Sequence, residues 1–168
     1  MATLHLIEGP VGAGKSTYAA KLALELSAPH LDLDEWMVVL FRPDRPDDGF
    51  MDWYAERKDR CIEQIWRVAQ CVLDAGQDIV LELGLVQRVL REAVYARAEL
   101  IDHELSVHVL DAPESIRWQR VQQRNEAADG TFKMVVPKEI FDVATGAWEA
   151  PDEDECVARN IKLVDTAN

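Results

Sequence analysis

Short apolar runs alternate along the chain with longer stretches in which apolar residues recur every three or four positions. The short runs predict strands at 3–8, 30–34, 78–84, 105–111 and 160–165. The longer stretches predict helices over 15–26, 53–75, 87–100 and 113–125. The proline- and aspartate-rich stretch 41–52 is expected to be a loop. Alternating strands and helices predict an α/β fold with a parallel sheet, whose ligands bind at the carboxyl ends of the strands.

Length and composition narrow the class of protein without naming an activity. The 168 residues suit one domain over 1–168. The net charge of −13 would repel a phosphate backbone, so no nucleic-acid partner is expected, and it agrees with a neutral or cationic substrate. No apolar run approaches the ~20 residues of a membrane span and no export signal is evident, so a cytoplasmic protein without a membrane partner is expected. A monomer and a homodimer are both compatible with this composition.

The stretch "GPVGAGKS" carries the most specific signal, because it fits G-x-x-x-x-G-K-[ST] between a predicted strand and a predicted helix. Glycines there let backbone N–H groups curl around an anion at a helix N-terminus. The Lys15 ammonium would reach the β- and γ-phosphates of ATP, the Ser16 hydroxyl would ligate Mg²⁺, and Thr17 would contact the α-phosphate. The predicted nucleotide-binding residues are Gly9, Val11, Gly12, Ala13, Gly14, Lys15, Ser16 and Thr17.

Acidic residues follow the second and third predicted strands. Asp32 and Asp34 lie two positions apart, so on a strand their side chains point to the same side. One would hold Mg²⁺ through water, and the other would accept a proton from an acceptor hydroxyl. Alternatively, Asp34 caps the next helix and Asp32 is solvated. Glu82 ends the third strand and is a further candidate ligand of the metal.

Arginines are concentrated at two places in this acidic chain. Arg88 and Arg91 lie three positions apart on one predicted helix, where they would clamp an anionic part of substrate or transition state, or simply face solvent. Arg117, Arg120 and Arg124 form one stripe of a later helix and predict an anion site. The alternative is an ordinary surface helix whose arginines pair with neighbouring acids.

Other segments carry weaker signals. A polar segment over about 124–140 is expected to form a lid over the nucleotide. The acidic run 149–155 predicts a solvated loop or, alternatively, an acidic lip for a cationic substrate. Trp36 follows Asp34 closely and is a candidate for substrate contact, whereas Trp53, Trp66 and Trp118 are expected to pack. The histidines are scattered, and neither a catalytic triad nor a metal set is expected among them.

The chain resembles the small P-loop kinases related to zeta toxin, chloramphenicol phosphotransferase and shikimate or gluconate kinase, including short bacterial AAA-type ATP-binding proteins. The resemblance rests on "GPVGAGKST", "LDLDEW", "LELGLVQRVLRE", "LDAPESIRWQRVQQRN" and "WEAPDEDE". It implies a three-layer P-loop NTPase sandwich with strand order 2-3-1-4-5 and an adenine pocket around 164–166. It also implies that Asp34 is the catalytic base and that Arg120 and Arg124 are adenine-side and lid arginines. Many relatives carry aspartate where Glu82 stands.

Together these features predict an ATP- and Mg²⁺-dependent phosphotransferase. It would move the γ-phosphate to a hydroxyl of a small molecule, such as a metabolite or an antibiotic. The alternative is an ATP-hydrolysing or ATP-binding regulatory protein without a small-molecule acceptor. The carboxylates after the second strand favour transfer, because a protein that only binds ATP needs no base.

Overall fold

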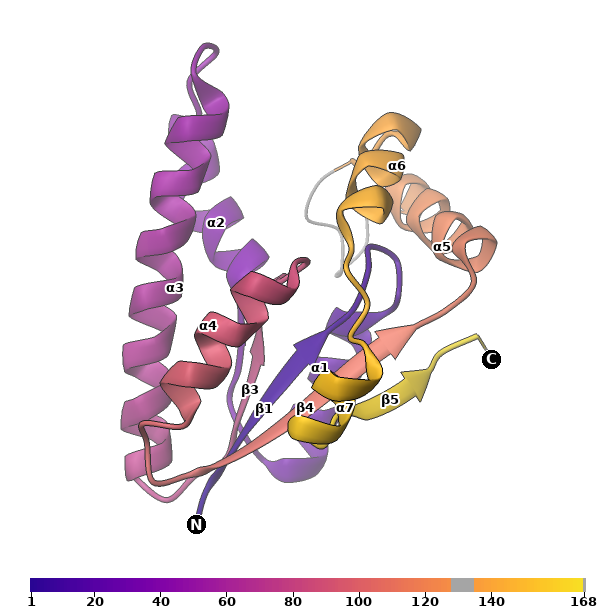
Figure 1. Cartoon of the computed structure of the whole chain (residues 1–168). Helices are drawn as coiled ribbons and strands as arrows, with labels where there is room; N and C mark the ends of the chain where they lie inside the picture. The colour runs from indigo at the N-terminus through magenta and orange to yellow at the C-terminus, as the bar shows by residue number, and fades with distance from the viewer. Residues whose placement is uncertain (128–134, 168) are drawn as a thin grey trace.

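The computed structural model describes residues 1–127 and 135–167. Within these residues, five strands form one parallel sheet in the order β2-β3-β1-β4-β5, which confirms the predicted fold class and strand order (Figure 1). Each strand ends in an acidic residue, so the carboxyl edge of the sheet is rich in carboxylates. The strands are β1 (Thr3–Glu8), β2 (His30–Asp32), β3 (Ile79–Glu82), β4 (Glu104–Asp111) and β5 (Lys162–Asp165).

The helices connect these strands and extend beyond their carboxyl ends. The four predicted helices are present, and the longest begins at Phe50 rather than at 53. That helix ends just before Gly76, whose φ of 80° is the left-handed conformation that favours glycine. The helices are α1 (Lys15–Leu26), α2 (Leu33–Phe41), the 3₁₀ turn η1 (Arg42–Asp44), α3 (Phe50–Asp74), α4 (Arg88–Ala98), α5 (Glu114–Ala127), α6 (Lys138–Ala147) and α7 (Glu153–Ala158).

Side chains that alternate along β1 build a core on each face of the sheet. Leu4 and Leu6 belong to the larger cluster, together with residues of α2, α3 and α4. Ile7 points to the other face and packs with Ala19 and Ala23 of α1. The sheet is therefore the middle layer of a three-layer sandwich, while α5 and α6 lie beyond its carboxyl edge (Figure 1). None of the described helices is long and apolar enough to cross a membrane.

Two short helices lie where a strand exit and a loop were expected. α2 begins directly after β2 because the Asp32 carboxylate accepts hydrogen bonds from the backbone N–H groups of Asp34 and Glu35. In the acidic run, the Asp152 carboxylate likewise caps α7 through the backbone N–H of Glu155. Acids in a first helical turn interact favourably with the helix dipole, so a charge run that predicts a solvated loop forms a helix start instead.

Two of the histidines that look isolated in the sequence meet across the sheet. His5 on β1 and His108 on β4 lie with ring nitrogens 3.3 Å apart. The Tyr18 hydroxyl of α1 lies 2.8 Å from the other ring nitrogen of His108. Burial lowers the pKa of His108 to about 4, so the neutral pair fills the interface between the sheet and α1.

Candidate nucleotide and acceptor site

The glycines of the loop between β1 and α1 occupy positions where a side chain would not fit. Gly9 and Gly12 have φ values of 151° and 79°, which residues with a side chain rarely adopt. A Cβ atom on Gly9 would lie 2.4 Å from the carbonyl oxygen of Leu110, and one on Gly12 would lie 2.5 Å from that of Arg117. The loop is therefore held against β4 and α5, and its path depends on these two glycines.

The Lys15 ammonium closes over the same loop. Its Nζ donates hydrogen bonds to the carbonyl oxygens of Gly9 and Pro10, at 2.9 and 3.1 Å. α1 begins at Lys15, so its first N–H groups, the ammonium and the loop meet at one wall of a cavity of about 1080 Å³. Ala13, within the loop, is buried. The other predicted nucleotide-binding residues all line the cavity: Gly9, Val11, Gly12, Gly14, Lys15, Ser16 and Thr17.

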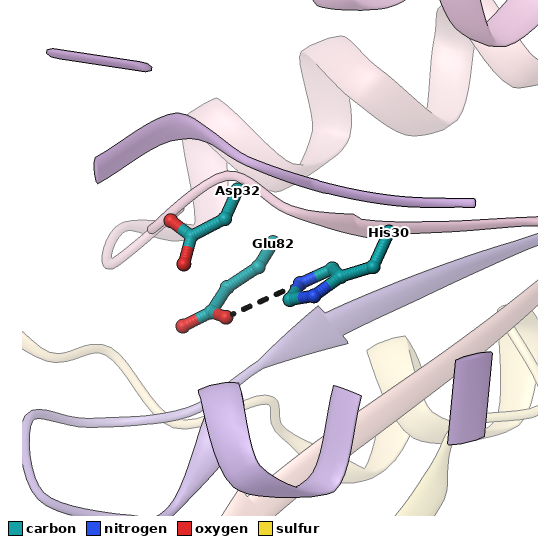
Figure 2. A group of neighbouring side chains, drawn as sticks. All are labelled: His30, Asp32 and Glu82. Atoms are coloured by element: carbon teal, nitrogen blue, oxygen red, sulfur yellow. Dashed lines mark ion pairs between the residues drawn. The ribbon is translucent and has the colours of Figure 1, made fainter. Parts of the chain in front are cut away.

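A hydroxyl and two carboxylates gather beside this wall, where β2 and β3 end. The Ser16 hydroxyl donates a 3.0 Å hydrogen bond to Oε1 of Glu82. Oε2 of Glu82 is buried, has no hydrogen-bond partner in the described part of the chain, and lies 3.6 Å from Nε2 of His30. Figure 2 shows the His30 ring facing the Glu82 carboxylate, with Asp32 beside them. One ligand atom from each of His30, Asp32 and Glu82 lies within 4.8 Å of the others.

These groups fit a divalent cation. Mg²⁺ prefers oxygen ligands and is commonly held by one or two carboxylates together with substrate phosphates. The Ser16 hydroxyl and the unpartnered oxygen of Glu82 supply such ligands next to the glycine loop, and Asp32 adds a carboxylate. The longer glutamate side chain reaches Ser16 from β3. The proximity of His30 was missed in the sequence, because only the register of β2 on β3 brings it to Glu82.

The sequence-based picture of Asp32 and Asp34 as neighbours on one strand is wrong. β2 ends at Asp32, and Asp34 lies in the first turn of α2. Asp32 is the cap, not Asp34, so the alternative arrangement is not found either. Asp34 is open to the cavity, where the surrounding protein displaces bulk water and raises the pKa of its carboxyl, against the opposing effect of Lys15. Among the α2 residues that line the cavity, Asp34 is the only one with a carboxylate.

The predicted arginine stripe on α5 divides into a structural residue and two cavity residues. Arg117 is buried and lies outside the cavity lining. Its guanidinium donates hydrogen bonds to the carbonyl oxygens of Ala112 and Val11, so it braces the glycine loop rather than an anion. Arg120 lines the cavity and donates to the carbonyl and hydroxyl oxygens of Thr166. Thr166 also lines the cavity, at the place where the adenine pocket was predicted.

Arg124 interacts electrostatically with the Asp34 carboxylate. It lines the cavity, and its Nε is buried without a hydrogen-bond partner among the described residues. Burial lowers the pKa of Arg124, and the Asp34 carboxylate opposes that shift. A cation held in this way is available to an anion that enters the cavity. The predicted lid over 124–140 includes residues 128–134, which lie outside the described residues.

The predicted clamp of Arg88 and Arg91 is not part of this cavity. Arg91 is fully buried, and its guanidinium donates two hydrogen bonds, of 2.7 and 2.9 Å, to the Glu155 carboxylate of α7. The Tyr95 hydroxyl donates to the same carboxylate. Arg88 pairs with Asp152 on the surface. The acidic run therefore neutralises the two arginines and holds α7 on α4, which leaves neither a clamp nor an acidic lip.

The predictions for Trp36 and Trp53 are also wrong, whereas Trp66 and Trp118 pack against apolar clusters as expected. Trp36 does not line the cavity but packs against the core, whereas Trp53 at the start of α3 does line it. Asp34 and Trp36 are two positions apart on a helix, so they face different directions. The side of the cavity opposite the glycine loop is called the α2–α3 wall below. It consists of Met37, Val38, Arg42, Arg45, Phe50, Met51, Trp53 and Tyr54.

A buried carboxyl lies directly beneath the glycine loop. Glu8 ends β1 and is completely buried. Its Oε2 accepts a 3.0 Å hydrogen bond from the Leu85 N–H, while Oε1 has no partner among the described residues. Burial raises the pKa of Glu8 to about 8, with Lys15 opposing the shift. Glu8 thus joins the loop to the segment after β3 in its protonated form.

Replacing Glu8 with glutamine is expected to change how stability depends on pH. In the wild type this carboxyl ionises near 4.5 when unfolded and near 8 when folded, so its contribution to stability is lost as pH rises between these values. The glutamine side chain keeps an acceptor for the Leu85 N–H and cannot ionise. Between about pH 5 and pH 8, the free energy of unfolding of Glu8→Gln should rise relative to wild type by at least about 1 kcal/mol. Urea unfolding followed by tryptophan fluorescence measures this difference.

A matched control is Glu104→Gln, which changes an exposed glutamate on β4. It should follow the wild-type pH dependence. Parallel stability curves for wild type and Glu8→Gln would contradict the buried, protonated state of Glu8.

Fold and site together define a P-loop protein of the nucleotide-binding, phosphoryl-transfer class. A glycine loop precedes a helix that begins with a lysine, carboxylates stand at the strand ends, and arginines of α5 line the same cavity. The chain belongs to the AAA domain family AAA_33, whose family model matches residues 4–151.

Sequence comparison finds a cytidylate kinase from Natronomonas pharaonis that is 32% identical over 127 residues. The match covers 73% of this chain and 59% of the relative, so the chain spans less than two thirds of that protein's length.

Solved structures share the fold at low sequence identity. A sugar kinase from Janibacter sp. superposes with a TM-score of 0.65 at 17% identity, covering 98% of this chain and 86% of the other. A gluconokinase from Sinorhizobium meliloti gives 0.61 at 17% identity, with 99% and 83% covered. A chain of an RNA repair complex gives 0.62 at 20% identity, with 87% and 43% covered. The resemblance to small P-loop kinases is thereby confirmed, and phosphoryl transfer in general is supported.

Proposed function

We propose that this protein transfers the γ-phosphate of MgATP to a hydroxyl group of a small molecule. One observation carries the proposal. The Asp34 carboxylate and the glycine loop line the same cavity, and Asp34 comes from α2, which takes no part in the loop. Its raised pKa makes it a stronger base than an ordinary aspartate. A protein that only holds nucleotide has no use for a carboxylate in that position.

The nucleotide side of the cavity has a donor for each part of a triphosphate. The loop N–H groups, the α1 N-terminus and Lys15 would bind the phosphates, while Arg120 beside Thr166 would lie on the adenine side. Ser16 and Glu82, with Asp32 near them, would hold Mg²⁺, which neutralises phosphate charge when it is bound.

The acceptor side needs a base and a cation. Asp34 would orient the acceptor hydroxyl toward the γ-phosphate and accept its proton as the new P–O bond forms. Arg124 would donate to the phosphoryl oxygens, since its Nε is unpartnered within the described residues and faces the field of Asp34. The bond between the γ-phosphorus and the β–γ bridging oxygen breaks, and ADP leaves with that oxygen. Lys15 and Arg124 would offset the negative charge that develops during the transfer.

Replacing Arg124 with alanine is expected to lower turnover more than ATP affinity. Its guanidinium would meet the charge that develops on the transferring group, so the loss falls on the transition state. We expect kcat to fall about 10-fold or more, while Kd for ATP changes less than about 3-fold. Steady-state kinetics and calorimetry measure the two. Gln122→Ala, an exposed change on the same helix, is the control, and equal losses in kcat and affinity would assign Arg124 to ground-state binding.

The direct test is a screen of the purified protein with ATP, Mg²⁺ and a panel of hydroxylated metabolites and antibiotics. ADP release and a phosphoryl mass gain on one acceptor class are expected. ADP release at one constant rate, whatever the acceptor, would overturn the proposal in favour of an ATPase. Hydroxyl-terminated RNA belongs in the panel because one structural neighbour is part of an RNA repair complex, although the net charge of −13 opposes such a partner.

A further inference from the structure

The charge of the cavity is opposite to the charge of the chain. The whole sequence has 18 lysines and arginines against 31 acids. Among the residues that the structure describes, the cavity is instead lined by six cations and two acids, Asp34 and Glu82. The six cations are Lys15, Lys21, Arg42, Arg45, Arg120 and Arg124. Such a local reversal concentrates anions in the cavity and repels cations, contrary to the substrate charge expected from composition.

ATP and its metal account for only part of this positive charge. Lys15 and Lys21 belong to α1, and Arg120 and Arg124 belong to α5, so these four stand on the nucleotide side. Arg42 and Arg45 stand on the α2–α3 wall, in and just after η1. Two arginines therefore line the acceptor side of the cavity, the same side as the Asp34 carboxylate.

Aromatic rings lie next to those arginines. Phe50, Trp53 and Tyr54 line the wall from the first turns of α3. The ring centroids of Phe50 and Tyr54 are 5.7 Å apart, and those of Phe50 and Trp53 are 6.1 Å apart. The Arg45 guanidinium carbon lies 3.9 Å from the Phe50 ring centroid. On this wall, therefore, a positively charged guanidinium group is in contact with an aromatic ring.

The ring of Trp53 is held in place from outside the cavity lining. The Arg57 guanidinium carbon lies 4.4 Å from the centroid of the Trp53 ring, and its Nη1 donates a 3.1 Å hydrogen bond to the Trp53 carbonyl oxygen. A ring fixed in this way loses little entropy when a flat ligand stacks on it. The cavity of about 1080 Å³ lies just above the range of about 300–1,000 Å³ that is common for a pocket for one small ligand.

We infer that the acceptor is a planar, anionic small molecule that carries a hydroxyl group, an inference that rests on the proposed transfer to a hydroxyl. Its ring lies against Trp53 and Phe50, and its carboxylate or phosphate contacts Arg42 and Arg45. Its hydroxyl lies at Asp34. A flat ring bound on the α2–α3 wall stacks on aromatic side chains, and an anionic group at the edge of that ring meets the two guanidinium groups.

The test is calorimetric binding to the full chain saturated with Mg²⁺ and a non-hydrolysable ATP analogue. The probes separate ring from charge: cytidine monophosphate and cytidine, 4-hydroxybenzoate and 4-hydroxybenzyl alcohol, and gluconate and glucose. We expect at least one charged ring compound to bind about 10-fold or more tightly than both its neutral partner and gluconate. The phosphate and carboxylate arms identify which anion is preferred. Failure of both charged ring compounds to bind more tightly would overturn the inference.

Variants locate the binding on the α2–α3 wall. The double variant Arg42→Gln, Arg45→Gln should lower the affinity for the preferred charged probe about 10-fold or more. Trp53→Leu should lower the affinity for both that charged probe and its neutral partner. The affinity for the ATP analogue should be unchanged in both variants. The control is Arg67→Gln, an exposed arginine of α3 paired with Glu63 outside the cavity. Unchanged probe affinity in the double variant, or loss of ATP-analogue affinity instead, would overturn the assignment.

The binding result and the transfer result can fail separately. If charged ring probes bind as expected but no compound gains a phosphoryl group, the proposed transfer fails while the acceptor wall stands. If a neutral, ring-free hydroxyl compound is phosphorylated, the transfer stands and the inferred acceptor class is wrong.

Discussion

Replacing Lys15 with alanine is expected to abolish ATP turnover and leave the fold intact. In the structure its Nζ is held by the carbonyl oxygens of Gly9 and Pro10, so the ammonium is already placed over the phosphate-binding loop. Without it, charge that develops on the transferring phosphoryl group loses a preorganised donor, which typically costs about 10²–10³-fold or more in rate. Coupled ADP release measures the turnover, and circular dichroism on heating checks the fold.

The Lys15 side chain can be removed without disturbing the apolar core. Lys15 lines a cavity and belongs to neither apolar core cluster beside the sheet, so its loss removes no core side chain. A matched control is Lys162→Ala on β5, which should keep full turnover. The Lys162 ammonium donates a hydrogen bond to the Ser106 hydroxyl, outside the cavity lining. Turnover in Lys15→Ala at the level of this control would remove the glycine loop from the reaction.

Replacing Asp34 with asparagine should separate nucleotide binding from transfer. Asparagine keeps the shape of the side chain but cannot take a proton, so transfer should fall by about 10²-fold or more while ATP affinity stays within about 3-fold of wild type. Initial rates with the acceptor found in the screen, together with calorimetry for ATP, measure the two quantities.

The pH dependence adds a second readout for Asp34. Because the folded protein raises the pKa of this carboxyl above its ordinary value, wild-type transfer should decline on the acidic side at a higher pH than an ordinary aspartate would give. Asp34→Asn should lack that decline. Glu35→Gln changes the exposed neighbour on α2 and should behave as wild type. An unchanged transfer rate in Asp34→Asn would mean that another group takes the proton.

The glycine loop and the sheet could be predicted from the sequence because their signals are local. The motif "GPVGAGKS" specifies the loop between β1 and α1 from its own residues. Hydrophobic periodicity alone located the five strands and the four long helices. The strand order followed from resemblance and is confirmed. The short helix α2 was missed because its apolar residues 36–41 form a continuous run that a strand exit would also show, and its Asp32 cap resembles a strand-end aspartate.

The partners of the charged residues could not be predicted in the same way. Arg91 and Glu155 are 64 positions apart and meet only because α7 packs on α4. The sequence pattern around Arg91 does not distinguish it from Arg124, since both lie on predicted helices near a second arginine. In the structure Arg91 is neutralised in a buried ion pair, whereas Arg124 lines the cavity. Charge and spacing describe one element at a time, whereas desolvation and pairing depend on what other segments bring to it.

The phosphate-binding end of this protein is therefore encoded in short-range sequence, since glycine conformation, strand period and helix start act within a few residues. The acceptor end is decided by packing. Which aspartate caps a helix and which opens to the cavity depends on where β2 ends. That Trp53 rather than Trp36 joins Arg42 and Arg45 on the α2–α3 wall depends on how α2 and α3 lie on the sheet. Side-chain direction is a property of the assembled layers, because each helix can expose or bury any face until its neighbours are in place.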